Sequence, residues 1–335
     1  MARKYLVTGA TGFIGSQLVS RLAAEGAEVR CLIAPRQKNG LPGYPEAEFV
    51  VVDLSDAAAL DEASRGIDVV YHLAAWIRPD KSIDGFDSVS KKYRQVNVEG
   101  TKLLAEACAR NKVRLFVYFS SVEAVGLGRG ITEESPCQPV TDYGRSKFEA
   151  EQYILGMVKA RGFPAIIIRP GLVYGRGNMA MLPLFRLAKK GLAVTIRDGS
   201  NLMPFCFIDD LLRGALLAER QGRVGQIYHI TGRPYAFREF IKTIGEELGV
   251  KVFPVRLPLG MVNTAISLKE LMEKACRFRV YPFRILCNKD TIRLMYNDWD
   301  ILAEKAGREL CFAPAFDLKK GIRSTVRWYQ ENNLL

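Results

Sequence analysis

Three side chains with complementary proton chemistry lie close together in the sequence. Tyr143 and Lys147 are four residues apart in a segment with helical apolar spacing, which predicts a phenol and an ammonium on one helix face. A tyrosine with its ordinary pKa of about 10 is a poor base at neutral pH, but a neighbouring ammonium favours the phenolate. Ser121 follows an apolar run typical of a strand, so we expect its hydroxyl at the crevice beyond that strand. Together they predict proton exchange with the oxygen of an alcohol or carbonyl group.

A glycine-rich turn near the start of the chain is the second chemical feature. Three glycines follow a short apolar strand with the spacing G-x-x-G-x-x-G and lead into a helical pattern, which is the context that a dinucleotide-binding turn requires. Without Cβ atoms, backbone N–H groups and the positive helix end can approach a pyrophosphate closely. The residues expected to line the cofactor there are Gly9, Thr11, Gly12, Phe13, Ile14 and Gly15.

The end of the second predicted strand bears on the ribose of such a cofactor. An acidic residue about 20 positions after the turn would hold a free 2′-hydroxyl. No carboxylate lies between Leu32 and Arg36, whereas Arg36 and Lys38 could pair with a 2′-phosphate. We therefore expect NADP, with NAD as the alternative; Arg36 could also be only a solvated loop charge.

The pattern of the first 170 residues explains how these groups could be brought together. Short β-rich runs alternate with helical segments, which indicates βαβ units and a parallel sheet whose ligand lies at the carboxyl ends of the strands. We expect an α/β fold, a Rossmann-type doubly wound parallel sheet. The predicted strands are Lys4–Val7, Glu28–Ile33, Phe49–Val52, Asp68–His72, Arg114–Phe119, Ala165–Ile168 and, later, Gln226–Ile230.

The domain division follows from the same pattern. Residues 1–170 are expected to form the dinucleotide-binding domain, and residues 171–335, where glycines and prolines loosen the pattern, mainly a smaller C-terminal substrate-binding lobe. Residues 205–232 still carry a helical and a β-rich segment, so we expect them to return to the first sheet.

Composition restricts the partners. Lys and Arg outnumber Asp and Glu by 48 to 36, a net charge of +12, which favours anionic partners such as a phosphate-rich cofactor. The basic residues are spread along the chain without a nucleic-acid-binding signature, so no nucleic acid is expected. Seven cysteines without a C-x-x-C pair argue against a disulfide framework or a zinc site. We expect no metal and a cytoplasmic protein.

Residues 258–285 suggest a possible contact with a membrane surface. An apolar helix-like run is followed by cations, and such a face could rest on lipid or receive a hydrophobic substrate. An ordinary amphipathic core helix is the preferred interpretation. The cations are Lys269, Lys274, Arg277, Arg279 and Arg284.

With these motifs in place, the chain resembles the extended short-chain dehydrogenase/reductase family, which includes NAD-dependent epimerases and dehydratases and a 3β-hydroxysteroid dehydrogenase-like branch. The resemblance covers nearly the whole chain. Besides the glycine turn and Ser121, Tyr143 and Lys147, the matching segments are Asp53-Leu54, His72-Leu73-Ala74-Ala75, Asn97-Val98-Glu99-Gly100-Thr101, Arg169-Pro170-Gly171 and Val173-Tyr174-Gly175.

The resemblance implies a role for each matching residue. Tyr143 would be the general acid/base, Lys147 would hold the nicotinamide ribose and tune the tyrosine, and Ser121 would orient the substrate oxygen. Asp53 would contact adenine, although it could instead cap a helix, and Asn97 could lie in a turn or helix start. A helix-paired homodimer is also implied. The further cofactor-lining residues would be Asp53, Leu54, Leu73, Ala74, Ala75, Asn97, Tyr143, Lys147, Pro170 and Val173.

The segment around residue 203 bears on the substrate. Family members that act on nucleotide-sugars usually carry an Arg there for the nucleotide phosphate, whereas this chain has Met203, which loses charge-assisted hydrogen bonds. Residues 199–210, 225–231 and 319–328 look more like the 3β-hydroxysteroid and sterol dehydrogenase branch. We expect an NAD(P)-dependent oxidoreductase that interconverts a secondary alcohol and a ketone on an apolar, sterol-like small molecule.

Other functions remain open. A nucleotide-sugar epimerase could draw phosphate contacts from Arg176, Lys189 or Lys190. Sugar dehydratases of the family follow the catalytic hydroxyl with Asp-Glu, but here the pair is Val122-Glu123, so Glu123 is expected to pack or hydrogen-bond rather than catalyse. A non-catalytic NADP-sensing binding protein or a structural subunit should have lost the tyrosine and lysine, and both are present.

Overall fold

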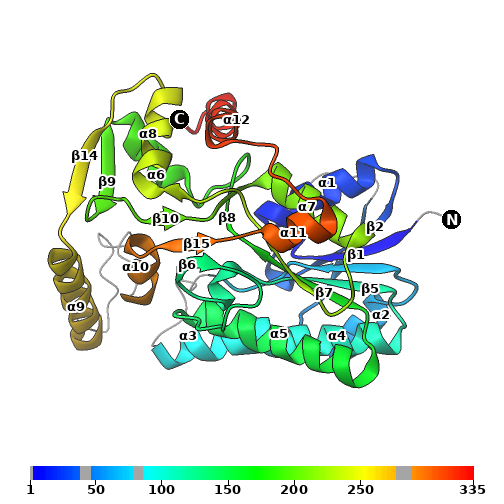
Figure 1. Ribbon diagram of the computed structural model, residues 1–335. Helices are drawn as coiled ribbons and strands as arrows, with labels where there is room; N and C mark the ends of the chain where they lie inside the picture. Colours follow the sequence, from blue (N-terminus) through cyan, green and yellow to red (C-terminus); the bar gives the residue numbers. More distant parts are fainter. Residues whose placement is uncertain (1–2, 38–46, 78–85, 277–288) are drawn as a thin grey trace.

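A seven-stranded parallel sheet forms the centre of the computed structural model, which describes residues 3–37, 47–77, 86–276 and 289–335 (Figure 1). The strand order is β12-β7-β5-β4-β1-β2-β3. This order and the helices between the strands confirm the predicted Rossmann-type α/β fold. The strands are β1 (Lys4–Thr8), β2 (Glu28–Ile33), β3 (Ala47–Val51), β4 (Val69–His72), β5 (Leu115–Phe119), β7 (Ala165–Pro170) and β12 (Ile227–Ile230).

The predicted strand limits differ from the observed ones by at most two residues. Strand β2 has the predicted limits, whereas β3 begins two residues earlier and β7 ends two residues later than expected. The difference at β7 arises because Arg169 and Pro170 continue the parallel register with β12, where they lie opposite His229 and Ile230. Pairing with β12 thus extends β7 to Arg169 and Pro170, although these residue types do not by themselves predict a strand.

Helices cover both faces of the sheet and bury most residues of its strands, whereas the edge strand β3 stays partly exposed. In β1, Leu6 packs into one core and Val7 into the other, which explains why the strands are continuously apolar. Figure 1 shows α2 (Ala57–Ala63), α4 (Gly100–Arg110) and α5 (Asp142–Arg161) below the sheet. Above it lie α1 (Phe13–Ala24), α7 (Ile208–Gln221) and α11 (Glu304–Leu310).

The order of the strands reverses at β1. From there the chain proceeds to β2 and β3 on one side and then returns to β4 and β5 on the other. A crevice opens at such a switch point, beyond the carboxyl ends of the strands. Four candidate segments lie at this edge because each comes at the carboxyl end of a strand. The glycine turn follows β1, residues 73–75 follow β4, Ser121 follows β5, and Pro170 ends β7.

The remaining elements are small strand pairs and helices, most of them in the C-terminal half. In Figure 1, α6, α8 and α12 gather at the upper left beside β9 and β14. Of residues 205–232, β12 joins the seven-stranded sheet and β11 pairs with β8, while the division into two domains stays a prediction. The strand pairs are β8 (Leu172–Tyr174) with β11 (Phe205–Phe207), β9 (Leu192–Ile196) with β14 (Phe253–Leu257), β10 (Leu202–Met203) with β13 (Tyr235–Ala236), and β6 (Gly128–Ile131) with β15 (Trp299–Ile301). The helices are α3 (Phe86–Tyr93), α6 (Leu182–Lys189), α8 (Phe237–Glu247), α9 (Leu259–Cys276), α10 (Lys289–Tyr296) and α12 (Leu318–Glu331), with short turns η1 (Pro35–Gln37), η2 (Arg94–Glu99) and η3 (Val122–Ala124).

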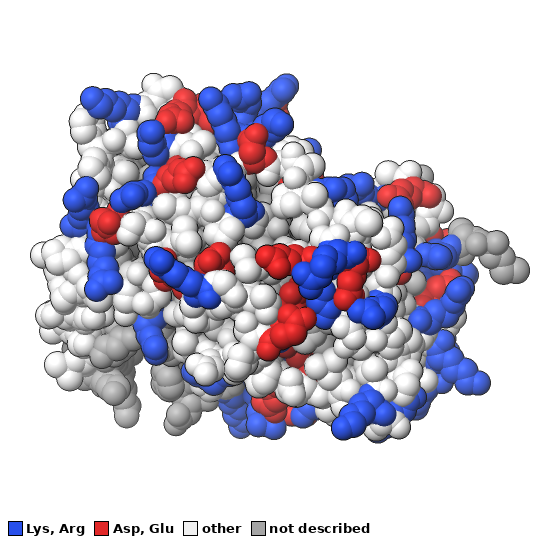
Figure 2. Space-filling model, viewed as in Figure 1, with Lys and Arg blue, Asp and Glu red and all other residues white. Residues whose placement is uncertain are grey.

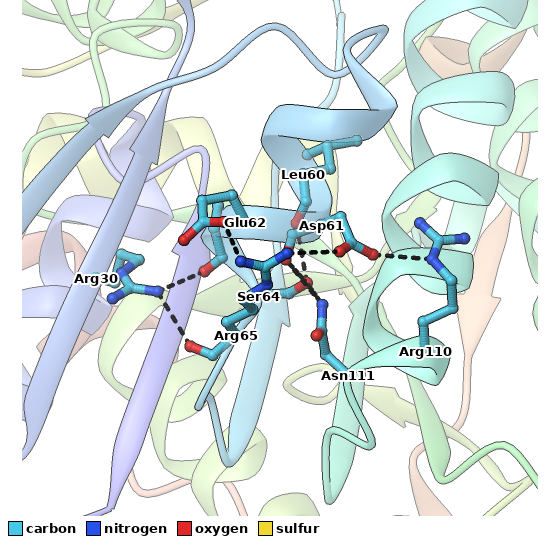
Figure 3. A network of polar contacts seen from close by, with 9 residues as sticks. Arg30, Leu60, Asp61, Glu62, Ser64, Arg65, Arg110 and Asn111 are labelled. Carbon is cyan, nitrogen blue, oxygen red and sulfur yellow. Dashed lines mark hydrogen bonds and ion pairs between the residues drawn. The ribbon is translucent and has the colours of Figure 1, made fainter.

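A shallow hollow lies between the ends of α2 and α4, at the edge of the sheet opposite the glycine turn. Figure 3 shows that its charged side chains satisfy one another: Asp61 accepts a hydrogen bond from Arg110 Nε at 2.8 Å, and Arg65 pairs with Glu62 at 2.6 Å. Asn111 Nδ2 donates to Ser64 Oγ at 2.8 Å. These contacts join the two helices, and we assign the hollow no catalytic role.

Candidate active site

The glycine turn packs tightly against the chain that follows β4. Gly9 has a φ of +68°, and a Cβ at this position would lie 2.8 Å from Ala74 N. A Cβ on Gly15 would overlap Gly9 O, and Gly12 N donates to the same carbonyl at 2.9 Å. Glycine is required here because backbone occupies the space that a side chain would need.

The start of α1 suits an anionic group. Gly12 at the N-cap offers no side-chain acceptor, and the first turn has no acidic residue, so backbone N–H groups point outward at the positive end of the helix. Thr11 Oγ1 is buried and has no hydrogen-bond partner among the described residues. Phe13 and Ile14 are half-buried in the first turn. These features fit the pyrophosphate of a dinucleotide.

A hydrogen-bonded set of side chains organises the end of β4. His72 is fully buried, with Nδ1 2.7 Å from Thr8 Oγ1 and Nε2 2.8 Å from Thr101 Oγ1. Thr101 donates its proton to Asn97 O, so His72 Nε2 carries the hydrogen and Nδ1 accepts from Thr8. Ala74 N donates to Thr8 Oγ1 at 3.0 Å. The half-buried cofactor candidates Leu73, Ala74 and Ala75 follow directly.

Asn97 holds this loop and the tyrosine helix together. It lies in the π-helical turn η2 and is 1% exposed. Its amide exchanges hydrogen bonds with Trp76 N at 2.7 Å and Trp76 O at 3.0 Å, and it also donates to Ser146 Oγ at 3.0 Å. Since these bonds engage both ends of the amide, Asn97 can shape the cofactor site by fixing residues 74–76.

The adenine side contains Asp53 and Leu54. Asp53 is exposed after β3, and its Oδ1 accepts from Ser55 N at 2.9 Å and Ser55 Oγ at 2.7 Å. The cap of α2 is Asp56, not Asp53, so the alternative interpretation of Asp53 as a helix cap is wrong. Leu54 is half-buried, and it packs where a Cβ on Gly100 would otherwise lie.

Two cofactor candidates cannot be placed by their side chains. The backbone of Arg36 lies in η1, directly after β2. Its side chain and the whole of Lys38 lie outside the described residues. The preference for a 2′-phosphate therefore stays a prediction from sequence.

Ser121, Tyr143 and Lys147 come from two adjoining elements. Ser121 caps η3, and its Oγ accepts from Glu123 N at 3.1 Å. Tyr143 lies in the first turn of α5 and is half-buried, and its ring centroid is 6.1 Å from that of Tyr93. Lys147 is 1% exposed, with Nζ 4.4 Å from the centroid of the Tyr118 ring. Ser121 thus lies just beyond β5, and Tyr143 and Lys147 lie on the adjoining helix α5.

Burial changes the acidity of both groups on α5. It lowers the pKa of Lys147 to about 7, against the opposing effect of Glu151. Burial, followed by the charges of Glu123 and Tyr93, raises the pKa of Tyr143 above its ordinary value. This net shift is opposite to the stabilisation of the phenolate that we expected from Lys147. At neutral pH Tyr143 carries its proton and can donate it.

Residues 170 and 173 continue the same edge, whereas residue 203 does not. Pro170 is buried at the end of β7, and Val173 is half-buried in β8, where its carbonyl accepts from Asn178 Nδ2 at 2.8 Å. Met203 is 4% exposed and pairs with Tyr235 across β10 and β13. Position 203 is thus part of the hydrophobic core that also contains Val7 and Ile168 of the large sheet.

Arg176 and the two lysines of α6 were the possible substitutes for a phosphate-binding arginine. Arg176 Nη2 donates to both carboxylate oxygens of Asp209, at 2.7 and 3.0 Å. Lys189 and Lys190 are exposed at the end of α6. The guanidinium charge of Arg176 is therefore already compensated by a carboxylate.

The surface and the remaining composition add few constraints. Figure 2 shows Lys and Arg scattered over the visible face, with Asp and Glu between them. Within the described residues, no cluster of three potential metal-ligating side chains occurs, and none of the helices has the length and apolarity to cross a bilayer.

In α9, Val262 and Ile266 are buried while Met261 and Leu268 are exposed. Residues 277–285 of the segment considered for membrane contact lie outside the described part.

Several organising residues were not identified from the sequence. Thr8 and Thr101 orient His72, and Thr141 caps α5 through a bond from Gly144 N at 2.9 Å. Thr141 had a recognisable signal, since threonine just before a helical pattern is a preferred N-cap. The partners of His72 come from β1 and α4, and no local spacing indicates them.

Comparison with known proteins shows which family and which enzymes the chain resembles. A model of the NAD dependent epimerase/dehydratase family matches residues 5–231. The chain is 30% identical over 344 residues to a 3 beta-hydroxysteroid dehydrogenase/Delta 5→4-isomerase of Mycobacterium tuberculosis, covering 97% of this chain and 90% of that protein. It is 26% identical to the 4-hydroxy-2-methyl-3-oxo-4-farnesyl-3,4-dihydroquinoline-1-oxide ketoreductase of Stigmatella aurantiaca, covering 94% and 93%.

A solved structure shows the same fold. The dTDP-glucose 4,6-dehydratase DesIV of Streptomyces venezuelae, crystallised with NAD, superimposes with a TM-score of 0.75 and 26% identity, covering 98% of each chain. The similarity therefore extends over nearly the whole chain, beyond the seven-stranded sheet.

Proposed function

The chain belongs to the NAD dependent epimerase/dehydratase family, and we propose that it is an NAD(P)-dependent oxidoreductase interconverting a secondary alcohol and a ketone on an apolar, sterol-like substrate. The observation that carries this proposal is that Ser121, at the cap of η3, and Tyr143 and Lys147, on the adjoining helix α5, come from the sheet edge that also holds the glycine turn. The relatives named as a hydroxysteroid dehydrogenase and a ketoreductase support the reaction class.

The residues of the chain divide the work of the reaction. Ser121 would hold the substrate oxygen, and Tyr143 would give that oxygen a proton during reduction or take one during oxidation. Lys147 would bind the nicotinamide ribose and supply positive charge near the phenol. Hydride exchange with the carbinol carbon is the chemistry that a nicotinamide would supply when bound. Lys147 is buried and Tyr143 is half-buried, which would limit the access of water to these contacts.

The cofactor would lie across the switch point. The turn of residues 9–15 would hold the pyrophosphate, Asp53 and Leu54 the adenine end, and residues 73–75 with Pro170 and Val173 the nicotinamide end. Asn97 would act indirectly, through the backbone of Trp76. We propose NADP as the preferred cofactor because β2 is followed by Arg36 and no carboxylate, and NAD as the alternative.

Two described positions, 203 and 176, favour an apolar substrate. A nucleotide-sugar needs fork-shaped cations for its diphosphate, but position 203 is a buried methionine and Arg176 is paired with Asp209. The similarity to DesIV favours a second candidate, a nucleotide-sugar epimerase or dehydratase. Its weakness as a dehydratase is the Val122-Glu123 pair in place of Asp-Glu.

We further propose a homodimer acting in the cytoplasm. The support is the family resemblance, together with the absence of a C-x-x-C pair among the seven cysteines. Sedimentation of the purified protein at two concentrations tests the dimer, since a single monomeric species at both would contradict it.

A paired titration tests cofactor and substrate class together. The purified protein is titrated with NADPH, NADH and UDP-glucose by fluorescence and calorimetry, and then assayed with NADP or NAD and a 3β-hydroxysteroid, dehydroepiandrosterone. Binding of NADPH with steroid oxidation, and without UDP-glucose binding, is the expected result. Tight UDP-glucose binding would instead support the epimerase candidate.

Substitution of the tyrosine tests the assigned chemistry. Tyr143→Phe removes the proton that passes to the substrate oxygen but keeps the ring, so turnover should fall by about 10²-fold or more while the dissociation constant of NADPH stays unchanged. Initial rates and a fluorescence titration measure the two effects. Wild-type turnover in Tyr143→Phe would show that the assignment is wrong.

A further inference from the structure

A chain of hydrogen bonds connects the turn that carries Ser121 to the helix that carries Tyr143. Ser121 Oγ accepts from Glu123 N at 3.1 Å, and Glu123 Oε2 accepts from Thr141 Oγ1 at 2.6 Å. Thr141 Oγ1 in turn accepts from Gly144 N at 2.9 Å and caps α5. Glu123 therefore contacts Ser121 through its backbone and the start of α5 through its side chain.

The two elements also meet backbone to backbone. A Cβ on Gly144 would overlap Glu123 O, and it would come within 3.1 Å of Thr141 Oγ1. Thr141 is 7% exposed. Because the link is shielded in this way, loss of one partner would leave a buried polar group without its hydrogen bond.

We propose that Glu123 and Thr141 are positioning residues whose hydrogen bond fixes the Ser121 turn against the first turn of the Tyr143 helix. The bond thereby sets the separation of the two hydroxyls that hold the reacting oxygen. This inference rests on the proposed function of Ser121 and Tyr143, and it gives neither Glu123 nor Thr141 a proton-transfer step. Displacement of a reacting group by about 1 Å can cost about 10²-fold in rate, so such a link affects turnover without touching substrate.

Glu123 also has an electrostatic effect that can be separated from its hydrogen bond. Its carboxylate on η3 accepts from Thr141 and acts electrostatically on Tyr143, and the ring centroid of Tyr93 on α3 lies 6.1 Å from that of Tyr143. The charge of Glu123 raises the pKa of Tyr143, and burial raises the pKa of Glu123 itself. Glu123→Gln keeps an oxygen acceptor for Thr141 but removes the charge, whereas Glu123→Ala removes both.

The experiment compares variants of the full-length protein in oxidation of dehydroepiandrosterone. Glu123→Ala and Thr141→Val should each lower kcat by about tenfold or more, with the KM of the cofactor unchanged. Thr141→Ser and Glu123→Gln keep the hydrogen bond and should have the kcat of the wild type. Glu123→Gln should also move the pH midpoint of oxidation to lower pH. The matched control is Asp317→Ala, which removes a comparable N-cap from α12 and should leave kcat unchanged.

Wild-type kcat in Glu123→Ala would overturn the proposal, even if Thr141→Val fails to fold. An equal loss of kcat in Asp317→Ala would also overturn it, because the effect would then be general destabilisation. Tyr143→Phe separates this inference from the proposed function. If Tyr143→Phe is inactive while Glu123→Ala is fully active, only the positioning role fails.

A spectroscopic measurement applies if no steroid is turned over. The protein is labelled with ¹³Cζ-tyrosine, and the Tyr143 signal is assigned by its loss in Tyr143→Phe. Glu123→Ala should shift or broaden this signal, and Glu123→Gln should narrow it again to a single line. An unchanged Tyr143 signal in Glu123→Ala would overturn the positioning role without reference to the substrate.

Discussion

At the scale of single residues, burial decides how the chemical groups behave. The sequence indicates a tyrosine and a lysine on one helix face, and both lie on α5. Their surroundings then alter them, since burial lowers the pKa of Lys147 to about 7 and raises that of Tyr143. The chain presents a protonated phenol at neutral pH, which suits donation of a proton to a carbonyl oxygen.

The most deeply buried ion pair leads to a prediction about stability. Arg169 at the end of β7 donates to Glu151 of α5 at 2.9 and 2.7 Å, and the two side chains are 1% and 0% exposed. Arg169→Met should lower the free energy of unfolding by about 3–5 kcal/mol, because it leaves Glu151 buried without its partner. Urea unfolding measures the loss.

The double variant is the control for this pair. Arg169→Met with Glu151→Leu removes both charges and should recover part of the lost stability. If the single and double variants are equally unstable, the unpaired carboxylate is not the cause. The loss would then be assigned to packing around β7.

At the scale of elements, the first turn of the sheet shows how backbone contacts restrict sequence. Gly9 needs its positive φ, and Gly15 needs room because Gly9 O lies where its Cβ would be. The tight turn brings the N-terminus of α1 to the carboxyl end of β1, where an anionic group can meet its free N–H groups.

Substitution of Gly15 by alanine should therefore affect binding specifically. The added Cβ would push Gly9 O away and distort the turn, so the dissociation constant of NADPH should rise about tenfold or more. Gly156 provides the matched control, since it lies exposed in α5 with nothing near its absent Cβ. Gly156→Ala should leave NADPH binding unchanged and stabilise the helix by about 1 kcal/mol. Equal NADPH affinity in both variants would contradict the role of Gly15.

At the scale of the whole molecule, the sheet holds the two histidines of the chain in its interior. Both are fully buried, and burial lowers the pKa of each to about 3, with added effects from Lys147 on His72 and from Arg169 on His229. Below an unfolded-state pKa of about 6.5, the unfolded chain binds protons at these rings that the folded chain does not bind.

The free energy of unfolding should consequently fall as the solution is acidified. The histidine contribution is complete above pH 6.5 or so and is lost as the pH drops towards the folded pKa, at up to about 1.4 kcal/mol per pH unit for each ring. Between pH 7 and pH 5 the two rings together should cost about 4 kcal/mol. Denaturant unfolding at a series of pH values measures this slope.

A single substitution separates the effect of one histidine on the free energy of unfolding from the effect of carboxyl groups that titrate in the same pH range. Burial raises the pKa of Glu133, which acts in the opposite direction, because the folded chain then holds a proton more tightly. His229→Gln leaves these groups in place and should remove about 2 kcal/mol of the loss between pH 7 and pH 5. Identical pH slopes in wild type and His229→Gln would contradict a neutral, buried His229.

The sequence by itself determined the fold class, the family and the local motifs. Apolar strands that alternate with segments of helical periodicity specify the parallel sheet. The glycine turn and the Tyr-x-x-x-Lys pair can be recognised in the sequence because residues close together in the chain create their geometry. The assignment of Ser121, Tyr143 and Lys147 to one site could be made because each follows or lies within a recognisable element. Their catalytic role stays a prediction.

Only the tertiary structure decided which groups act on one another across the chain. Thr8 of β1 and Thr101 of α4 hydrogen-bond to the two ring nitrogens of His72. The side chain of Asn97 accepts a hydrogen bond from Trp76 N, and Met203 is buried in the hydrophobic core. Contacts between distant segments leave no local spacing in the sequence. They arise when parallel strands bring their carboxyl ends to one edge, and the desolvation that alters the pKa values exists only after that packing is complete.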